Sequence, residues 1–139
     1  MPGPYVQLAV VCEKVLQERD GVLSLIRVID RLSAVAPGPD APPELPEGLL
    51  RVTYVISLRS GEARGRYPLT VGVETPDGQA LPPQTLDVML EGEDRGVNLI
   101  LNLGVPALEG LYWFSVTLND QELTRTPFRV TYQRMPGTA

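Results

Sequence analysis

The sequence contains no histidine, a single cysteine and a single lysine among its 139 residues. Without histidine, the Ser-His and Cys-His pairs that activate most nucleophiles in covalent catalysis cannot form. One cysteine excludes an intramolecular disulfide and a cysteine-based metal site, and Cys12 occupies an apolar strand position typical of a buried thiol. We therefore expect a protein that is not an enzyme and that uses no cofactor.

Positive charge is also scarce, since Lys14 and eleven arginines face seventeen acidic residues, for a net charge of −5. This balance opposes binding to nucleic acid, and it opposes binding to an anionic membrane unless a cation mediates the contact. The N-terminus lacks the basic segment and the long apolar run of a signal peptide, and no stretch approaches membrane-spanning length. We expect a cytoplasmic bacterial protein.

What the chain does contain is an apolar residue at every second position through most of its length. In residues 110–120 the even positions Tyr112, Phe114, Val116 and Leu118 form one apolar face, and a polar turn and a second strand follow. The pattern recurs every ten to fifteen residues, which is typical of an all-β sandwich. We predict a single domain over residues 1–139, an antiparallel β-sandwich of about eight strands with immunoglobulin-like or related topology.

The expected strands are separated by segments rich in glycine and proline. Turns are expected at residues 61–65 and 91–96, and five prolines in residues 36–48 predict a crossover between strands. A proline-rich ligand for a recognition domain is the alternative interpretation of that crossover. Residues 133–139 are expected to fray. The expected strands are 5–16, with alternate residues from Val6 to Cys12 facing the core, then 22–35, 49–59, 66–75, 85–90, 97–103 and a terminal pair within 110–130.

Three apolar residues fall at positions that alternation directs away from the core. Trp113 lies between Tyr112 and Phe114, Ile100 between two asparagines, and Val55 between Thr53 and Ser57. If their strands share a sheet, Trp113, Ile100 and Val55 form an outward apolar patch of the kind that marks interaction sites. The alternatives are that the crossover or the C-terminal tail covers Trp113, or that a bulge turns it inward. The patch predicts a non-enzymatic interaction or structural module that binds a protein partner or forms a homodimer.

Acidic residues gather in one expected turn, where Glu91, Glu93 and Asp94 occur within four positions. Charged residues at such a turn are usually solvated and nothing more. The alternative is a calcium-dependent binding domain, because hard oxygen ligands in loops bind Ca²⁺ and a bound cation can bridge to anionic lipid.

Five segments carry a recognisable pattern, at residues 9–14, 20–30, 97–103, 110–114 and 127–130. In these segments the chain resembles a family of short uncharacterised bacterial proteins. The resemblance implies a stand-alone β-sandwich without an assigned activity, so it assigns no functional residues to this sequence.

Overall fold

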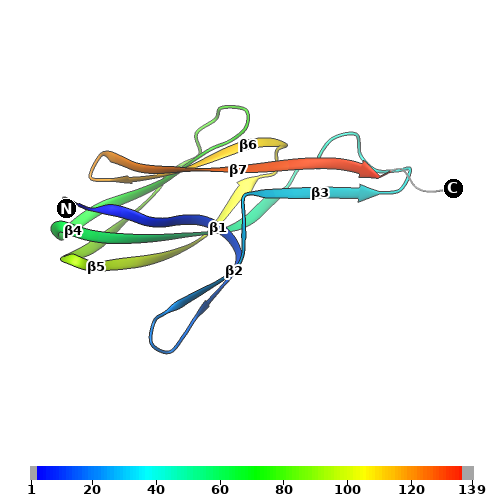
Figure 1. Ribbon diagram of the computed structural model, residues 1–139. Coiled ribbons are helices and arrows are strands. Elements are labelled where there is room, and N and C mark those ends of the chain that lie inside the picture. The colour runs from blue at the N-terminus through cyan, green and yellow to red at the C-terminus, as the bar shows by residue number, and fades with distance from the viewer. Residues whose placement is uncertain (1–2, 136–139) are drawn as a thin grey trace.

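The computed structural model describes residues 3–135, which form strands and no helix. The chain is therefore all-β in this range, and this part of the predicted fold class is confirmed. Within these residues, nothing forms a helix long and apolar enough to cross a membrane. The seven strands are β1 (Tyr5–Gln17), β2 (Leu23–Ile29), β3 (Arg31–Pro37), β4 (Leu49–Glu74), β5 (Gln84–Pro106), β6 (Gly110–Leu118) and β7 (Gln121–Met135) (Figure 1).

The strands pair in the order β2-β1-β4-β6-β7-β3, and β5 pairs with β4 off this path. Every pair is antiparallel except β3 with β7, which run parallel. The prediction of a wholly antiparallel sheet is wrong for this pair. The chain passes from β2 into β3 through the single residue Asp30, and it thereby reaches the edge of β7 running in the same direction. The immunoglobulin-like topology stays a prediction.

Strands β4 and β5 are longer than the sequence pattern predicts, because they pair along nearly their whole length. The turns expected at residues 61–65 and 91–96 are instead a bend that the two strands share. Gly61, Gly65, Gly92 and Glu93 adopt positive φ there, and the strand register shifts between residues 59 and 64. Glycine reaches this backbone region without the steric cost that a side chain adds, so these glycines permit a bend within a paired ribbon.

The number of strands differs from the prediction for the same reason. Two expected strands merge into β4, two merge into β5, and the expected strand 22–35 divides at Asp30 into β2 and β3. Seven strands result in place of about eight. The Asp30 carbonyl accepts a hydrogen bond from the Arg129 amide at 3.1 Å, which fixes the start of β3 against β7.

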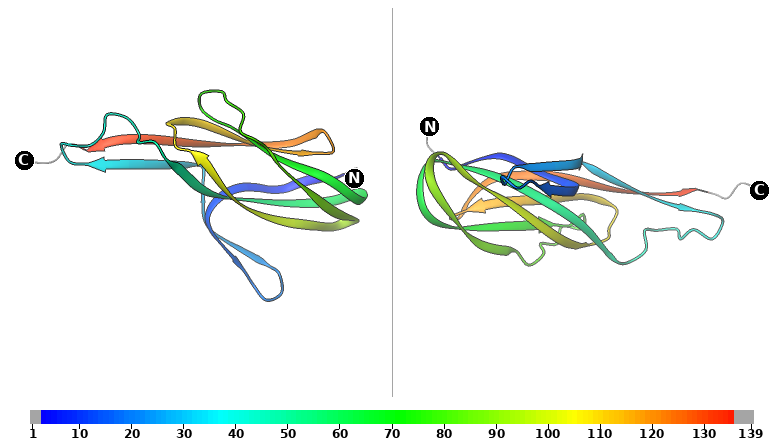
Figure 2. Two further views of the ribbon diagram at one scale, coloured as in Figure 1. Left: turned by 180° about the vertical axis from the view of Figure 1, so that it is seen from behind. Right: turned by 90° about the horizontal axis from the view of Figure 1, so that it is seen from below.

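The bend in β4 and β5 folds the sheet into two facing layers (Figures 1 and 2). The first half of β4 pairs with β1 and the second half of β5, whereas the second half of β4 pairs with β6 and the first half of β5. Between the layers, the ring of Tyr54 stacks on Phe114 with centroids 5.1 Å apart, and Phe128 meets Phe114 edge-on at 6.3 Å. The alternation predicted for β4 and β6 is confirmed, since most of their inward positions are buried and Leu50 and Tyr67 are half-buried.

A bulge in β1 changes which of its side chains face the core. The register against β4 shifts between Val6 and Leu8, so Val6, Ala9 and Val11 lie opposite the inward residues of β4. The predicted core face is therefore wrong beyond Val6, and Leu8 is 36% exposed. Cys12 is buried on the other side of the strand, as a buried thiol was predicted to be, and burial raises its pKa.

The proline-rich segment connects β3 to β4, as the crossover prediction requires, although its first two residues, Ala36 and Pro37, belong to β3. It is tied to β7 by a hydrogen bond from the Tyr132 hydroxyl to the Pro42 carbonyl at 2.7 Å. The predicted frayed tail is wrong for residues 133–135, which pair with β3. Residues 136–139 lie outside the described residues.

A chain of side-chain hydrogen bonds crosses the core and joins three strands. The Thr126 hydroxyl of β7 donates to the Ala9 carbonyl of β1 at 3.1 Å, and it lies 2.7 Å from the Tyr54 hydroxyl of β4. Because a hydroxyl has one proton to donate, Tyr54 is the donor to Thr126. These bonds link the two layers on the side where β1 and β7 face each other.

We expect Tyr54→Phe to lower the free energy of unfolding by about 1 kcal/mol, because one net hydrogen bond is lost. Thr126→Val should cost about 2 kcal/mol, since it leaves both the Tyr54 hydroxyl and the Ala9 carbonyl without their partner. Urea unfolding of both variants and the wild type measures the difference. Equal costs for the two variants would contradict the chain of bonds described here.

The stability of the fold should decrease at alkaline pH. Burial raises the pKa of the Tyr54 and Tyr112 phenols above the ordinary value of about 10 for tyrosine. A raised folded-state pKa means that the folded protein holds the proton more tightly, so this stabilisation is complete below about pH 10 and is lost as the pH rises through the folded-state values. Tyr54→Phe should reduce the alkaline loss relative to the wild type when thermal melts are compared between about pH 8 and 11.

Candidate binding surfaces

Val55 and Ile100 lie opposite each other on β4 and β5, as the patch prediction requires. Ile100 is 39% exposed, but Val55 is fully buried, so its prediction as a surface residue is wrong. The tip of the β1–β2 hairpin lies over this outer face and leaves a pocket of about 450 Å³. Val22 and Leu23 from the hairpin line it, with Val55 on the sheet side.

Trp113 lies on the opposite outer face of the molecule. Tyr54 and Phe114 meet between the layers, and alternation therefore sends their neighbours Val55 and Trp113 to opposite sides. Trp113 is half-buried beside the loop between β4 and β5, where Leu81 and Pro83 share a pocket of about 250 Å³ with it. The three predicted residues thus do not form one patch, and the segment beside Trp113 is neither of those that the sequence suggested.

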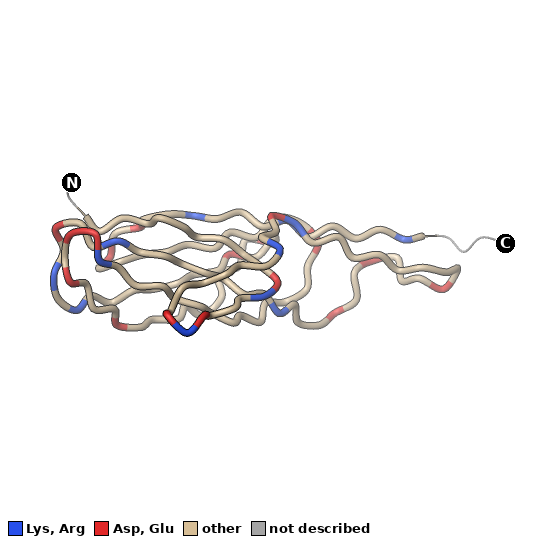
Figure 3. Tube along the Cα trace, turned by 60° about the horizontal axis from the view of Figure 1, so that its bottom comes forward, with Lys and Arg blue, Asp and Glu red and all other residues tan. Residues whose placement is uncertain are grey.

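The acidic residues predicted as an alternative metal site lie at the bend of β4 and β5, where Figure 3 shows acidic and basic residues side by side. Glu91 forms an ion pair with Arg95 at 2.8 Å, and the Asp94 carbonyl accepts a hydrogen bond from Arg59 at 3.3 Å. Over residues 3–135, no group of three or more histidine, cysteine or acidic residues is placed to hold a metal ion. The structure does not gather Glu91, Glu93 and Asp94 into a ligand set.

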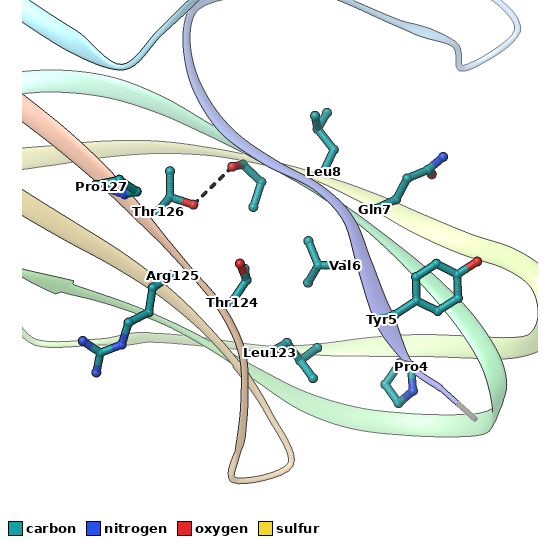
Figure 4. A pocket seen from close by; sticks show the side chains of 11 residues that line it. Pro4, Tyr5, Val6, Gln7, Leu8, Leu123, Thr124, Arg125, Thr126 and Pro127 are labelled. Atoms are coloured by element: carbon teal, nitrogen blue, oxygen red, sulfur yellow. Dashed lines mark hydrogen bonds between the residues drawn. The ribbon is translucent and has the colours of Figure 1, made fainter. Parts of the chain in front are cut away.

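A groove that the sequence did not predict lies between β1 and β7. Residues 5–10 of β1 pair only with β4, and residues 121–128 of β7 pair only with β6. The remaining edges of these two segments face each other across a space of about 550 Å³ (Figure 4). Within the described residues, no backbone hydrogen bond joins the two edges.

The side chains of the groove are apolar or small. Figure 4 shows Val6 from one strand and Thr124 and Leu123 from the other pointing into the gap, while Arg125 points away from it. Arg125 forms an ion pair with Glu122 at 2.8 Å on that outer surface. The hydrogen bond from the Thr126 hydroxyl to the Ala9 carbonyl closes one end of the gap. Because the Ala9 carbonyl points toward β7 in this bond, backbone acceptors of β1 face into the gap.

Proline and strand periodicity identify which backbone groups of β7 face the gap. Pro127 lies opposite Trp113 of β6, and proline is tolerated in a sheet where its missing N–H would have faced an open edge. Backbone groups of alternate residues point the same way, so the Arg125 amide and carbonyl also face the gap. A proline within an otherwise regular strand is the one sequence signal that points to this free edge.

Comparison with protein families agrees with the resemblance seen in the sequence. A family described as a family of unknown function, DUF6941, matches residues 7–131. The chain belongs to this family. The match covers every strand of this chain except the start of β1 and the end of β7, so the matched residues include the shared bend and most of the groove. No curated protein matches the chain.

The difference in burial between Val55 and Ile100 can be tested by introducing aspartate at each of these two paired positions in turn. Val55→Asp should lower the free energy of unfolding by about 3 kcal/mol or more, because it buries an unpaired carboxylate. Ile100→Asp should cost less than about 1 kcal/mol, because the new charge reaches solvent. Urea unfolding measures both, and equal costs would show that the hairpin does not cover Val55.

Proposed function

We propose that this chain is a non-enzymatic binding module that takes up an extended segment of a partner protein between β1 and β7. The supporting observation is the pair of unpaired backbone edges that face each other across the groove. A row of main-chain donors and acceptors along a strand edge is matched along its length by another extended polypeptide. Strand addition supplies affinity through the main chain, so it needs none of the catalytic side chains that this sequence lacks.

The direction of the added strand follows from the topology. The first half of β4 runs antiparallel to β1, and the bend reverses the direction of β4. β6 is antiparallel to the second half of β4, and β7 is antiparallel to β6. These four reversals leave β7 running the same way as β1, as Figure 1 shows. One strand placed between them is therefore antiparallel to both or parallel to both. We infer the antiparallel orientation, because its hydrogen bonds are straighter and slightly more stable.

The groove also limits the length and composition of the partner segment. The bond between Thr126 and Ala9 closes it at one end, which leaves residues 5–9 of β1, enough for a segment of about five residues. Alternate side chains of that segment would point between the layers toward Val6 and Leu123. These positions favour small or β-branched apolar residues, and the positions between them face solvent.

The two predicted surfaces elsewhere receive less support. Trp113 and Ile100 are partly exposed, but they lie on opposite faces of the molecule, and Val55, the third residue of the predicted patch, is buried. The calcium-dependent alternative has no converging acidic residues within 3–135 to support it. The groove combines space with unpaired backbone groups, which is why we favour it.

A library of displayed random heptapeptides, selected against the folded protein, tests the proposal. Selected peptides should carry apolar residues at alternate positions, and Arg125→Pro should weaken their binding about tenfold or more, because it removes a backbone donor from the groove edge. Arg125→Ala is the matched control, since it removes the same side chain and keeps the amide. Calorimetric titration of one selected peptide measures the dissociation constants.

Two results would overturn the proposal. One is a selection that yields no peptide that binds the wild type. The other is equal binding to Arg125→Pro and Arg125→Ala, which would place the peptide elsewhere. Hydrogen exchange gives an independent readout, because a peptide in the groove must protect the backbone amides of residues 5–9 that face the gap.

A further inference from the structure

The last seven residues of β7 and the whole of β3 form an arm that projects beyond the two layers (Figures 1 and 2). Seven residue pairs join the two strands in parallel, from Arg31 with Arg129 to Pro37 with Met135. Two-stranded ribbons are marginally stable alone, and parallel strands are normally covered on both faces. The arm is therefore a part of the fold that further contacts would stabilise.

One face of the arm is already covered by the proline-rich crossover. Ala41 is buried, the Tyr132 hydroxyl donates to the Pro42 carbonyl, and the Gly38 amide donates to the Met135 carbonyl. The half-buried residues of β3, which are Leu32, Ala34 and Ala36, occupy alternate positions and share this face. The opposite face is open, and Val35 is 54% exposed on it.

Among residues 3–135, β3 pairs with β7 and with no other strand, so its outer edge is open with respect to this part of the chain. The Asp30 carbonyl bonds to the Arg129 amide, so even-numbered residues of β3 direct their backbone groups toward β7. The backbone groups of Ser33 and Val35 must then point outward. Natural edge strands are usually protected from pairing by charges or bulges, yet residues 32–36 carry no charged side chain.

Charge favours a second copy of the chain as the occupant of this edge. Arg31 lies exposed at the base of the arm, and Asp40 lies exposed in the turn just beyond its tip. Suppose that two arms pair antiparallel, with a two-fold axis near Ala34. Arg31 of each copy then lies beside the tip of the other arm, where Asp40 lies. The interface is thus self-complementary, as two-fold symmetry requires.

We propose that the arm is a homodimer interface, in which β3 pairs antiparallel with β3 of a second copy. The product is a four-stranded ribbon in the order β7-β3-β3-β7, about 23 Å long from seven residues per strand. Each parallel pair gains an antiparallel neighbour, and the outward amides of Ser33 and Val35 gain partners. This interface is separate from the groove between β1 and β7.

Sedimentation velocity over a dilution series from about 100 μM to about 1 μM tests this proposal. The wild type should be a dimer at the high end. Val35→Pro should raise the dimer dissociation constant about tenfold or more, because it removes an outward amide and leaves the pairing with β7 intact. Val35→Ala, which keeps the amide, should dissociate at a concentration closer to that of the wild type.

Charge reversal gives a second test that does not depend on proline. Arg31→Asp and Asp40→Arg should each weaken the dimer, and the double variant should recover most of the loss. A wild type that stays monomeric throughout the series overturns the proposal. A dimer that is equally stable in Val35→Pro and Val35→Ala also overturns it. Arg125→Pro should leave the dimer unchanged, which separates this result from any failure of peptide binding.

Discussion

Where β4 and β5 bend together near Gly61 and Gly92, their backbone pairing continues while the ribbon changes direction. An amphipathic sheet must bury its apolar face against another element, and residues 3–135 contain no helix to supply one. The sheet therefore covers itself, because each half of β4 belongs to a different layer. The stacking of Tyr54 on Phe114 brings the two layers together only because the strands bend between them.

Folding one sheet over itself leaves its edges open. The free edges of β1 and β7 face each other on one side of the two layers. The side chain of Thr126 joins these edges, and within the described residues no backbone hydrogen bond does. The edges differ in how they are protected. The Glu91–Arg95 ion pair sits in the middle of β5, and Pro127 interrupts the free edge of β7, whereas residues 32–36 of β3 carry no such protection. The groove and the arm are thus two consequences of one topology.

Local pattern predicts the parts of this structure that local burial determines. The inward positions of β4 and β6 followed from alternation. Cys12 is buried as predicted, but on the face of β1 opposite to the one that alternation assigned to it. The glycines near residue 61 were misleading because glycine reports a local backbone conformation, and that conformation serves a bend within a pair as well as a turn. The burial of Val55 and the separation of Val55 from Trp113 depend on the β1–β2 hairpin and on layer assignment, and neither has a local signature.

The groove was missed for a further reason, which also explains why side-chain motifs assign no function to this chain. Its unpaired polar groups are main-chain amides and carbonyls, which every sequence contains, and only the pairing of strands reveals which of them are free. A binding site made this way needs no histidine, cysteine or lysine side chains.

Because the arm projects from the end of the molecule opposite the start of β1, pairing of two arms leaves both grooves open (Figure 1). A dimer would then bind a partner that carries two suitable segments more tightly than a single groove would. Once the first segment is bound, the second segment is held near the second groove, which raises its effective concentration there.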